Sequence, residues 1–417
     1  MSAETERRDR LHQLLDLARV YKGWTRADLA RSLARDPTKL YPDSGNPKLD
    51  FVVNLAGVLD WSVDAVIEHI WQSGPSEENA ATDDVFEQLD EQARDAHARG
   101  DWPALVNAAR RMNRVARSPE QRARACNREC GAWDGLGRYT LALDAISRGL
   151  QNGPLPAERR LQLQTNLANT HYTLWNLDTA HALAHVVVET YSLHPPISKI
   201  DRKNQAFALY VRGHTSRRMM DREPGSADEH ARAARRDLED SFRLYSRMAE
   251  EFADTRLAGI ANTNRAGVTE VDVQLGAITP DAGIQMLMDG LEAVIRTDTA
   301  LEGDWLESYG WWCVCGANIA LRRLEGRELQ QSMAVFTNKA LEIADKLDNW
   351  ALRERVFTMQ YALHETLMDA TGLELDFTID GEDMRLITGT MGRFPRFRDV
   401  GWNIIRSAKY VQENLSA

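Results

Sequence analysis

The spacing of apolar residues along the chain is helical almost everywhere. Near the start, positions i, i+3, i+4 and i+7 are occupied by Leu11, Leu14, Leu15 and Ala18. The same spacing returns in residues 206–213 and 284–295, as expected for helices that bury one face. Alternating patterns typical of strands are nearly absent, and residues 373–379 (LELDFTI) are the one tempting exception. The sequence therefore predicts an all-α fold.

One change of composition divides the chain. Residues 73–83 (SGPSEENAATD) are small and polar, with no large apolar side chain, which is typical of a flexible linker. This predicts an N-terminal module of residues 1–72 and a helical body of residues 84–417. Of the 417 residues, 43% are hydrophobic and 27% are charged. That composition allows both parts to fold around cores and argues against a disordered chain.

Five short helices are expected in the N-terminal module. Their predicted ranges are Leu11–Val20, Arg26–Leu33, a short third helix that begins at Pro37, Leu49–Asp60 and Val63–Ile70. Gly23 ends the first helix, and Thr25 with Asp28 three residues later predicts a capping box for the second. Asp36 before a proline is another helix start, and Ser62 is the expected cap of the last helix. Five helices of this length predict a small helix-turn-helix domain.

The order of these elements resembles the Cro/repressor class of helix-turn-helix domains. The residues that carry the resemblance are Thr25, the pair Leu29-Ala30, the segment Pro37–Tyr41, the run Pro47-Lys48-Leu49 and the pair Leu55-Ala56. Three departures are visible: Ala34 stands at the turn position where glycine is usual, Pro42 stops the third helix early, and the glutamate that commonly precedes the following turn is missing. The resemblance implies a DNA-binding module whose third helix reads bases in the major groove.

Charge is distributed unevenly between the two parts. Lys and Arg number 51 and Asp and Glu number 62, a net charge of −11, which by itself argues against a nucleic-acid coat. The stretch 19–48, however, carries seven basic and three acidic residues. We expect Arg26, Arg31 and Lys48 to anchor phosphates. The residues expected to reach bases are Arg35, Thr38, Lys39 and Tyr41.

The body shows loose internal repetition. Three bulky residues, spaced 37 and 38 residues apart, are each followed three residues later by a residue suited to close packing: Trp102 and Leu105, Tyr139 and Ala142, Leu177 and Ala180. This resembles the tetratricopeptide repeat, whose ideal period is about 34 residues. It predicts an α-solenoid of stacked antiparallel helix pairs. The strongly charged segment 212–236 interrupts the pattern and is expected to be an insertion or a long loop.

A stacked array of this kind exposes a concave groove lined by the first helix of each pair. Asparagines recur on the segments expected there, namely Asn127, Asn166, Asn169, Asn262, Asn264 and Asn318. Because an amide both donates and accepts hydrogen bonds, a file of asparagines can grip the backbone of an extended ligand. Arg265 and Arg212 are expected to meet an acidic group or a terminal carboxylate. The alternative is that these asparagines bond between neighbouring helices.

A Cro-like head followed by tetratricopeptide-like repeats resembles the RRNPP family of peptide-responsive quorum-sensing regulators of bacteria. The resemblance implies a homodimer held by the repeats, with a short peptide or protein in the groove that switches the heads on operator DNA. It rests on architecture and on no matched groove motif. The alternative from another class is a non-enzymatic scaffold or adaptor, for example in stress or phage defence, whose head is a docking module. The short third helix and the charge of −11 favour that alternative.

No catalytic chemistry is evident. The cysteines form two local pairs, Cys126/Cys130 and Cys313/Cys315, and are expected as small core residues rather than zinc ligands or disulfides. His181 and His185 lack the glutamate of a metalloprotease motif. We therefore expect neither a metal nor a cofactor, and no enzyme activity.

A weaker third alternative is an enzyme that uses a late acidic cluster, comprising Glu374, Asp376, Asp380, Glu382 and Asp383. Such clusters are usually solvated loops. The first residues are charged and lack the apolar run of a signal peptide, and no stretch has the length and apolarity of a membrane span. A cytoplasmic protein without membrane association is expected.

Overall fold

The computed structural model describes residues 3–61, 63–71, 83–296, 303–372 and 377–411. The fold is all-α, and it divides into two compact units, Met1–Ala80 and Ala81–Ala417. The expected linker, residues 73–83, lies almost wholly outside the described residues, as does Ser62. The two units are described separately below.

The first unit contains four α-helices and one 3₁₀ turn among its described residues. These are α1 (Ala3–Lys22), α2 (Arg26–Ser32), η1 (Pro37–Lys39), α3 (Leu49–Leu59) and α4 (Val63–Trp71). The predicted capping box is present, because the Thr25 hydroxyl accepts from the Asp28 amide and the Asp28 carboxylate accepts from the Thr25 amide. A core of aliphatic side chains together with Phe51 holds the helices together.

The third element of this unit is shorter than the sequence predicts. Only Pro37–Lys39 is helical, as a single 3₁₀ turn, whereas a helix over Pro37–Tyr41 was expected. The side chain of Asp36 accepts from the Thr38 amide at 2.7 Å and thereby closes the turn on itself. Ala34, at the position where glycine is usual, adopts φ of 52°, in the left-handed region that favours glycine. The tight turn between α2 and η1 is thus present, but the element that follows it is reduced to one turn.

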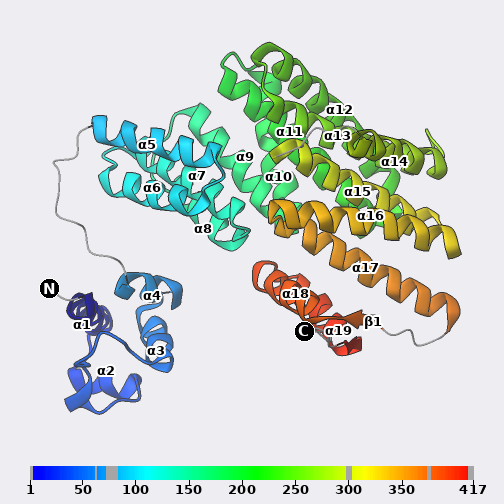
Figure 1. Ribbon diagram of the computed structural model, residues 1–417. Helices are drawn as coiled ribbons and strands as arrows, with labels where there is room; N and C mark the ends of the chain where they lie inside the picture. The colour runs from blue at the N-terminus through cyan, green and yellow to red at the C-terminus, as the bar shows by residue number, and fades with distance from the viewer. Residues whose placement is uncertain (1–2, 62, 72–82, 297–302, 373–376, 412–417) are drawn as a thin grey trace. The chain divides into compact units, whose positions relative to one another are not determined.

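The second unit is an α-solenoid of antiparallel helix pairs (Figure 1). The pairs are α5 (Asp83–Ala98) with α6 (Trp102–Val115), α7 (Pro119–Gly135) with α8 (Tyr139–Leu150), α9 (Ala157–Thr173) with α10 (Leu177–Leu193), α11 (Lys199–Arg222) with α12 (Ala227–Phe252), α13 (Thr255–Gln274) with α14 (Pro280–Arg296), and α15 (Gly303–Arg323) with α16 (Gly326–Leu347). The first helix of each pair contacts the first helix of the next. These first helices therefore form one continuous layer.

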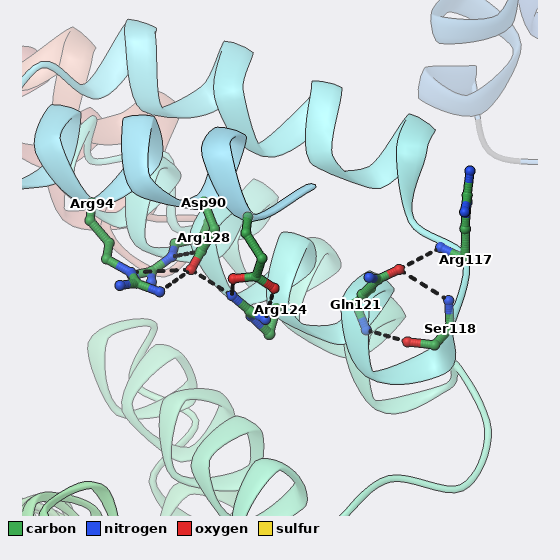
Figure 2. Close-up of polar contacts among 8 residues, drawn as sticks. Asp90, Arg94, Arg117, Ser118, Gln121, Arg124 and Arg128 are labelled. Carbon is green, nitrogen blue, oxygen red and sulfur yellow. Dashed lines mark hydrogen bonds and ion pairs between the residues drawn. The ribbon is translucent and has the colours of Figure 1, made fainter. Parts of the chain in front are cut away.

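The repeat phase predicted from the sequence matches the structure. Trp102, Tyr139 and Leu177 are each the first residue of the second helix of a pair, and the residues three positions later are fully buried. Gly135, at the end of α7, lies directly against the Trp102 indole, and a Cβ atom there would overlap the ring. Local caps fix the helix starts, as at α7, where Ser118 and Gln121 form the capping box seen in Figure 2.

The charged segment 212–236 is helical, and the expectation of a long loop there was wrong. Helix α11 continues to Arg222, one 3₁₀ turn, η2 (Pro224–Ser226), follows, and α12 begins at Ala227. The charges mislead because Arg217 and Arg218 are buried, with exposed fractions of 2% and 6%. Arg217 pairs with Glu270 and Arg218 donates to the Tyr172 carbonyl, so these arginines hold helices together rather than face solvent.

The C-terminal end comprises α17 (Trp350–Thr371), α18 (Gly381–Arg393) and α19 (Phe397–Ser407). Two short strands, β1 (Phe377–Ile379) and β2 (Ala408–Tyr410), pair in parallel. The strand lies in the segment that the sequence marked as the one exception to helical spacing. Of the late acidic cluster, Glu374 and Asp376 lie outside the described residues, while Asp380 and Asp383 form the capping box of α18.

The solenoid curls until its late helices contact its early ones. The Tyr139 ring at the start of α8 lies 5.0 Å from the Phe394 ring, centroid to centroid. Trp175 Nε1 donates to Glu354 Oε2 of α17 at 3.3 Å, and Arg256 of α13 donates to the Ala98 carbonyl after α5 at 3.3 Å. This closure brings the inner faces of the first helices around a common interior.

Candidate ligand-binding cavity

A cavity of about 450 Å³ lies in that interior. Every first helix from α5 to α17 contributes to its wall. Its aromatic lining consists of Trp102, Tyr139, Tyr172, Phe207, Tyr210, Trp311, Trp350 and Phe394. Its volume falls within the range of small-molecule and peptide sites, about 300–1,000 Å³. An aromatic wall of this extent offers a ligand flat apolar surfaces with little side-chain entropy to lose.

A second cavity of about 240 Å³ adjoins the first. The two share His97, Gly131, Asp134, Asn169 and Phe207 among their lining residues, so they lie side by side. The second cavity is more polar, and its further lining residues include Asn127, Arg128, Asn166 and Thr170. An aromatic chamber therefore adjoins an amide-rich one along α7 and α9.

Two carboxylates face the aromatic chamber without a cationic partner. No group among the described residues donates a hydrogen bond to Asp134, whose pKa is raised to about 7 by burial and by the charge of Glu307. Glu307 Oε1 accepts from Trp311 Nε1 and Asn349 Nδ2, both at 3.0 Å, and burial raises its pKa. Glu307 thus destabilises the ionised form of Asp134, and the charge of Asp304 adds to the effect of burial on Glu307.

Asp304 is a third acid of the lining, and burial raises its pKa. Arg218, Asp348 and Glu354, by contrast, have partners within the unit. Arg218 donates to the Tyr172 carbonyl at 2.8 Å and stacks on the Tyr172 and Trp175 rings. Asp348 pairs with Arg353 at 2.6 Å. Glu354 accepts from Trp175 and from Thr358 Oγ1 at 3.0 Å. The chamber therefore has acidic character, to which Asp134, Asp304 and Glu307 contribute.

Replacing Asp134 by Asn should stabilise the protein at pH 8 and have little effect at pH 5. Because the pKa of Asp134 lies above that of an unfolded chain, the folded state holds a proton that the unfolded state has lost, and the free energy of unfolding falls as pH rises from about 4 to about 7. Asn cannot ionise, so it removes that loss. We expect the free energy of unfolding at pH 8 to rise by about 2 kcal/mol, which is less than the full pKa shift would give because water in the cavity screens the charge. Urea unfolding at both pH values measures it.

The matched control for this prediction is Asp369→Asn, which changes an exposed carboxylate on α17. It should leave the pH dependence of the wild type intact. Parallel stability–pH curves for wild type and Asp134→Asn would contradict the expectation.

The structure separates the asparagines that the sequence grouped together. Asn127, Asn166 and Asn169 line the second cavity, and Asn166 Nδ2 donates to Asn127 Oδ1 at 2.7 Å. Asn262 and Asn264 are buried and donate to Ser308 Oγ at 2.8 Å and Ser241 Oγ at 3.0 Å.

The remaining candidates of that set lie away from both cavities. Asn318 donates to the buried carboxylate of Glu270 at 3.3 Å. Arg265 is exposed, with its guanidinium 5.7 Å from the Trp312 ring centroid. Arg212 is held by Asp237 at 2.7 Å. The structure thus brings three of the eight candidate ligand-binding residues together at one cavity.

The candidate DNA-binding residues lie on α2, on η1 and in the segments that flank η1, as far as the start of α3. Arg31, Thr38, Lys39 and Lys48 are exposed. Arg26 is also exposed, but its Nε donates to the Pro37 carbonyl at 2.8 Å, so it braces the 3₁₀ turn.

Two further members of this set are half-buried. The Arg35 guanidinium lies 4.4 Å from the Phe51 ring centroid, and the Tyr41 hydroxyl donates to Asp16 at 2.5 Å. Both side chains therefore have intramolecular partners within the first unit.

The four cysteines are buried and unpaired, as the sequence predicts. Among the residues that the structure describes, no three His, Cys, Asp or Glu side chains are placed to hold a metal ion. Within the same ranges, no helix has the length and apolarity to cross a membrane.

Sequence reasoning missed Asp134 and Glu307. Both had a local signal, an acidic residue among aromatic ones: Asp134 follows Trp133, and Glu307 stands between Trp305 and Trp311. An acid on an otherwise aromatic helical face marks either a buried structural contact or a binding site. Only the closure of the solenoid shows that the two acids share a cavity.

No protein-family model matches the sequence, and neither does any curated protein. Two solved structures are similar in fold, each at 10% identity. One is PlcR of Bacillus thuringiensis in complex with the peptide PapR7 and DNA, with a TM-score of 0.34 over 82% of this chain and 96% of that one. The other is a Rap protein complexed with competence and sporulation factor, with a TM-score of 0.41 over 96% of each chain. At these TM-scores the similarities carry no functional argument.

Proposed function

We propose that this protein is a ligand-responsive cytoplasmic regulator. Its helical-repeat unit binds a short peptide in the two adjoining cavities, and its N-terminal unit acts on operator DNA. The observation that carries the proposal is the cavity itself, where an aromatic chamber adjoins an amide-lined one in the interior of a closed solenoid. The proposal rests on this geometry and on the sequence of the head.

A peptide fits the lining better than a flat cofactor or a lipid does. Asn127, Asn166 and Asn169 offer both donors and acceptors to a peptide backbone, whatever its side chains. The aromatic rings provide surfaces for apolar side chains. A lipid would leave the amides and carboxylates unpaired, at a cost of about 1–3 kcal/mol for each buried group.

The head is proposed to contact DNA through its exposed residues around η1, namely Arg31, Thr38, Lys39 and Lys48. A homodimer would place two heads on two half-sites about one helical turn apart or a multiple of it. Sequencing of DNA that co-purifies with the protein from its native host would test the proposal and supply the operator. No enrichment of any sequence over random genomic fragments would contradict it.

Replacing Lys39 by Ala should weaken binding to the enriched DNA by about 1–3 kcal/mol, if Lys39 contacts a base edge. Gel-shift titration at moderate salt measures the loss, with Arg327→Ala as the control because Arg327 is an exposed basic residue of the second unit. Equal affinities of Lys39→Ala and wild type would exclude Lys39 from the interface.

A second candidate function is a protein adaptor whose head is a docking module. The observation that favours it is the single turn of η1, because a three-residue turn presents few side chains to a DNA groove. Arg26, braced on the Pro37 carbonyl, also has less freedom to reach a phosphate. A stoichiometric protein partner in a pull-down from the native host, together with no enriched DNA, would favour the adaptor.

A further inference from the structure

We propose that the cavity binds its peptide in one direction, with a cationic nitrogen between Asp134 and Glu307 and a carboxylate near Arg128. This inference rests on the proposed peptide binding and deepens it. It names the charge at each end of the ligand and the length between them. Its basis is the opposite charge at the two ends of these adjoining cavities.

The cationic end is defined by Asp134 and Glu307 in the aromatic chamber. Asp134 accepts no hydrogen bond within the described part of the chain, and Glu307 accepts both of its hydrogen bonds on Oε1. Arg218, the nearest buried guanidinium of the lining, is already held by the Tyr172 carbonyl and two aromatic rings. Two acids facing one cavity are therefore left without a cation.

The aromatic rings around these acids favour the same kind of ligand. A protonated amine or a guanidinium is attracted both to carboxylates and to the faces of Trp and Tyr rings. Tyr210, Trp311 and Trp350 line the chamber together with the two acids. A ligand cation here would remove the mutual repulsion of the carboxylates, and a neutral ligand would leave it in place.

The opposite end is basic. Figure 2 shows Arg94, Arg124 and Arg128 converging on Asp90, a carboxylate that is only 1% exposed. Arg124 is fully engaged, since it also binds Glu87 through both Nη atoms.

Arg128 is the member of this cluster that also lines the second cavity, and it donates to Asp90 through Nε, at 2.8 Å. A guanidinium has five N–H donors. Arg128 can therefore hold Asp90 and still donate to a ligand carboxylate.

A second observation also indicates a positive electrostatic potential near Arg128. Burial and the charges of Arg124 and Arg128 lower the pKa of Arg159, whose Nε is buried without a hydrogen-bond partner. Glu120 and Glu158 oppose the shift but do not cancel it. An anion is therefore stabilised near these guanidiniums.

The spacing of the two ends sets the length of the ligand. Asp134 and Arg128 are both on α7, six residues apart, and both line the second cavity, which Asp134 connects to the aromatic chamber. Six residues of helix span about 9 Å, and an extended peptide advances about 3.3 Å per residue. A peptide of about three to five residues therefore reaches from one end to the other, with side-chain reach included. Asn127, Asn166 and Asn169 lie beside its backbone.

Two sources could supply the cationic nitrogen, the free amino terminus or a Lys or Arg side chain. The probe is an equimolar library of tetrapeptides built from Gly, Ala, Ser, Leu and Phe. It is used with free termini, N-acetylated, C-amidated, and N-acetylated with one Lys. Affinity selection on the full-length protein, read by mass spectrometry, gives the retention of each form.

We expect peptides with free termini to be retained about 10- to 100-fold better than their N-acetylated forms, the usual effect of a charge-assisted hydrogen bond. Recovery of retention by the Lys-containing library would assign the site to a side chain, and no recovery would assign it to the amino terminus. C-amidation should also reduce retention.

Variants of the lining residues test which side chain recognises which end of the peptide. Asp134→Asn and Glu307→Gln should abolish the difference between free and acetylated peptides, and Arg128→Gln should abolish the difference between free and amidated ones. Asp369→Asn, exposed on α17, should keep both differences.

Two results would overturn the inference. Retention by the wild type that is indifferent to blocking of either terminus, with or without Lys, would overturn the charge assignment and leave peptide binding standing. Retention of no peptide by the wild type would overturn the proposed function as well.

Discussion

Replacing Glu270 by Gln is expected to lower the free energy of unfolding by about 3–5 kcal/mol, because it leaves a buried guanidinium without its counter-ion. Glu270 on α13 is 1% exposed and pairs with Arg217 of α11 at 2.5 Å and with Arg322 of α15 at 2.9 Å. Burial alone raises the pKa of Glu270, but these two arginines outweigh it and hold the pKa below its usual range. Urea denaturation at pH 7 measures the loss.

A double variant tests the cause. Arg217→Met together with Glu270→Gln removes both members of the buried ion pair. Arg322 still has an ion-pair partner, because it contacts Asp221 at 2.5 Å. We expect it to recover at least half of the lost stability, since an apolar side chain of similar volume carries no desolvation cost.

The control for the Glu270 variant is Glu251→Gln, which breaks the exposed pair of Arg202 and Glu251 between α11 and α12. Its unfolding midpoint should match that of the wild type, because solvent takes over the interaction. Equal losses in Glu270→Gln and Glu251→Gln would contradict the expectation.

Replacing Asp90 by Asn is expected to cost about 3 kcal/mol at pH 7, somewhat less than the Glu270 variant because Arg94 can turn outward to water. Asp90 is buried and accepts from Arg94, Arg124 and Arg128 at 2.5, 2.7 and 2.8 Å. The contacts from Arg124 and Arg128 join α5 to α7, whereas Arg94 lies on α5 itself (Figure 2). The first helix of the array should therefore loosen, with earlier proteolysis in α5.

The effect of Asp90 should depend on pH in a defined direction. Burial raises the pKa of Asp90, but the three arginines outweigh it and hold the pKa well below its usual range. The stabilisation is therefore complete above about pH 4, where the unfolded carboxyl is ionised, and is lost as pH falls further. The difference between wild type and Asp90→Asn should shrink between pH 4 and pH 2.

Glu87→Gln is the matched control for Asp90. Glu87 binds Arg124 on the same pair of helices, but its side chain is 54% exposed. If Glu87→Gln lost as much stability as Asp90→Asn, the effect would come from removing any negative charge near the arginines and not from the buried position of Asp90.

Several structural features could be predicted because their signals are local. The capping box of Thr25 and Asp28, and the starts of α6, α8 and α10 at Trp102, Tyr139 and Leu177, depend on residues within one or two helical turns. The short strand at Phe377–Ile379 lies where the spacing departs from helical. Each of these follows from side chains that meet their own neighbours in sequence.

The two errors have different physical causes. The first is that the charge of a segment does not show whether its side chains are buried. The segment 212–236 was expected as a loop because of its arginines, yet Arg217 and Arg218 are buried and satisfied by partners from other helices. The 3₁₀ turn η1 is shorter than expected because the Asp36 side chain closes a single turn. The sequence is compatible with a single turn and with a longer helix at this position.

The sequence by itself determined the all-α class, the phase of the early helix pairs and the caps that start them, since these depend on contacts over a few residues. Tertiary structure decided which polar side chains can meet a ligand. Asn169 faces a cavity while Asn264 is buried against Ser241, although both occupy first helices of their pairs. Likewise Asp134 and Glu307 share a chamber only because the solenoid curls until α17 contacts Trp175. The curvature arises from the sum of many interhelical contacts, and no single segment encodes it.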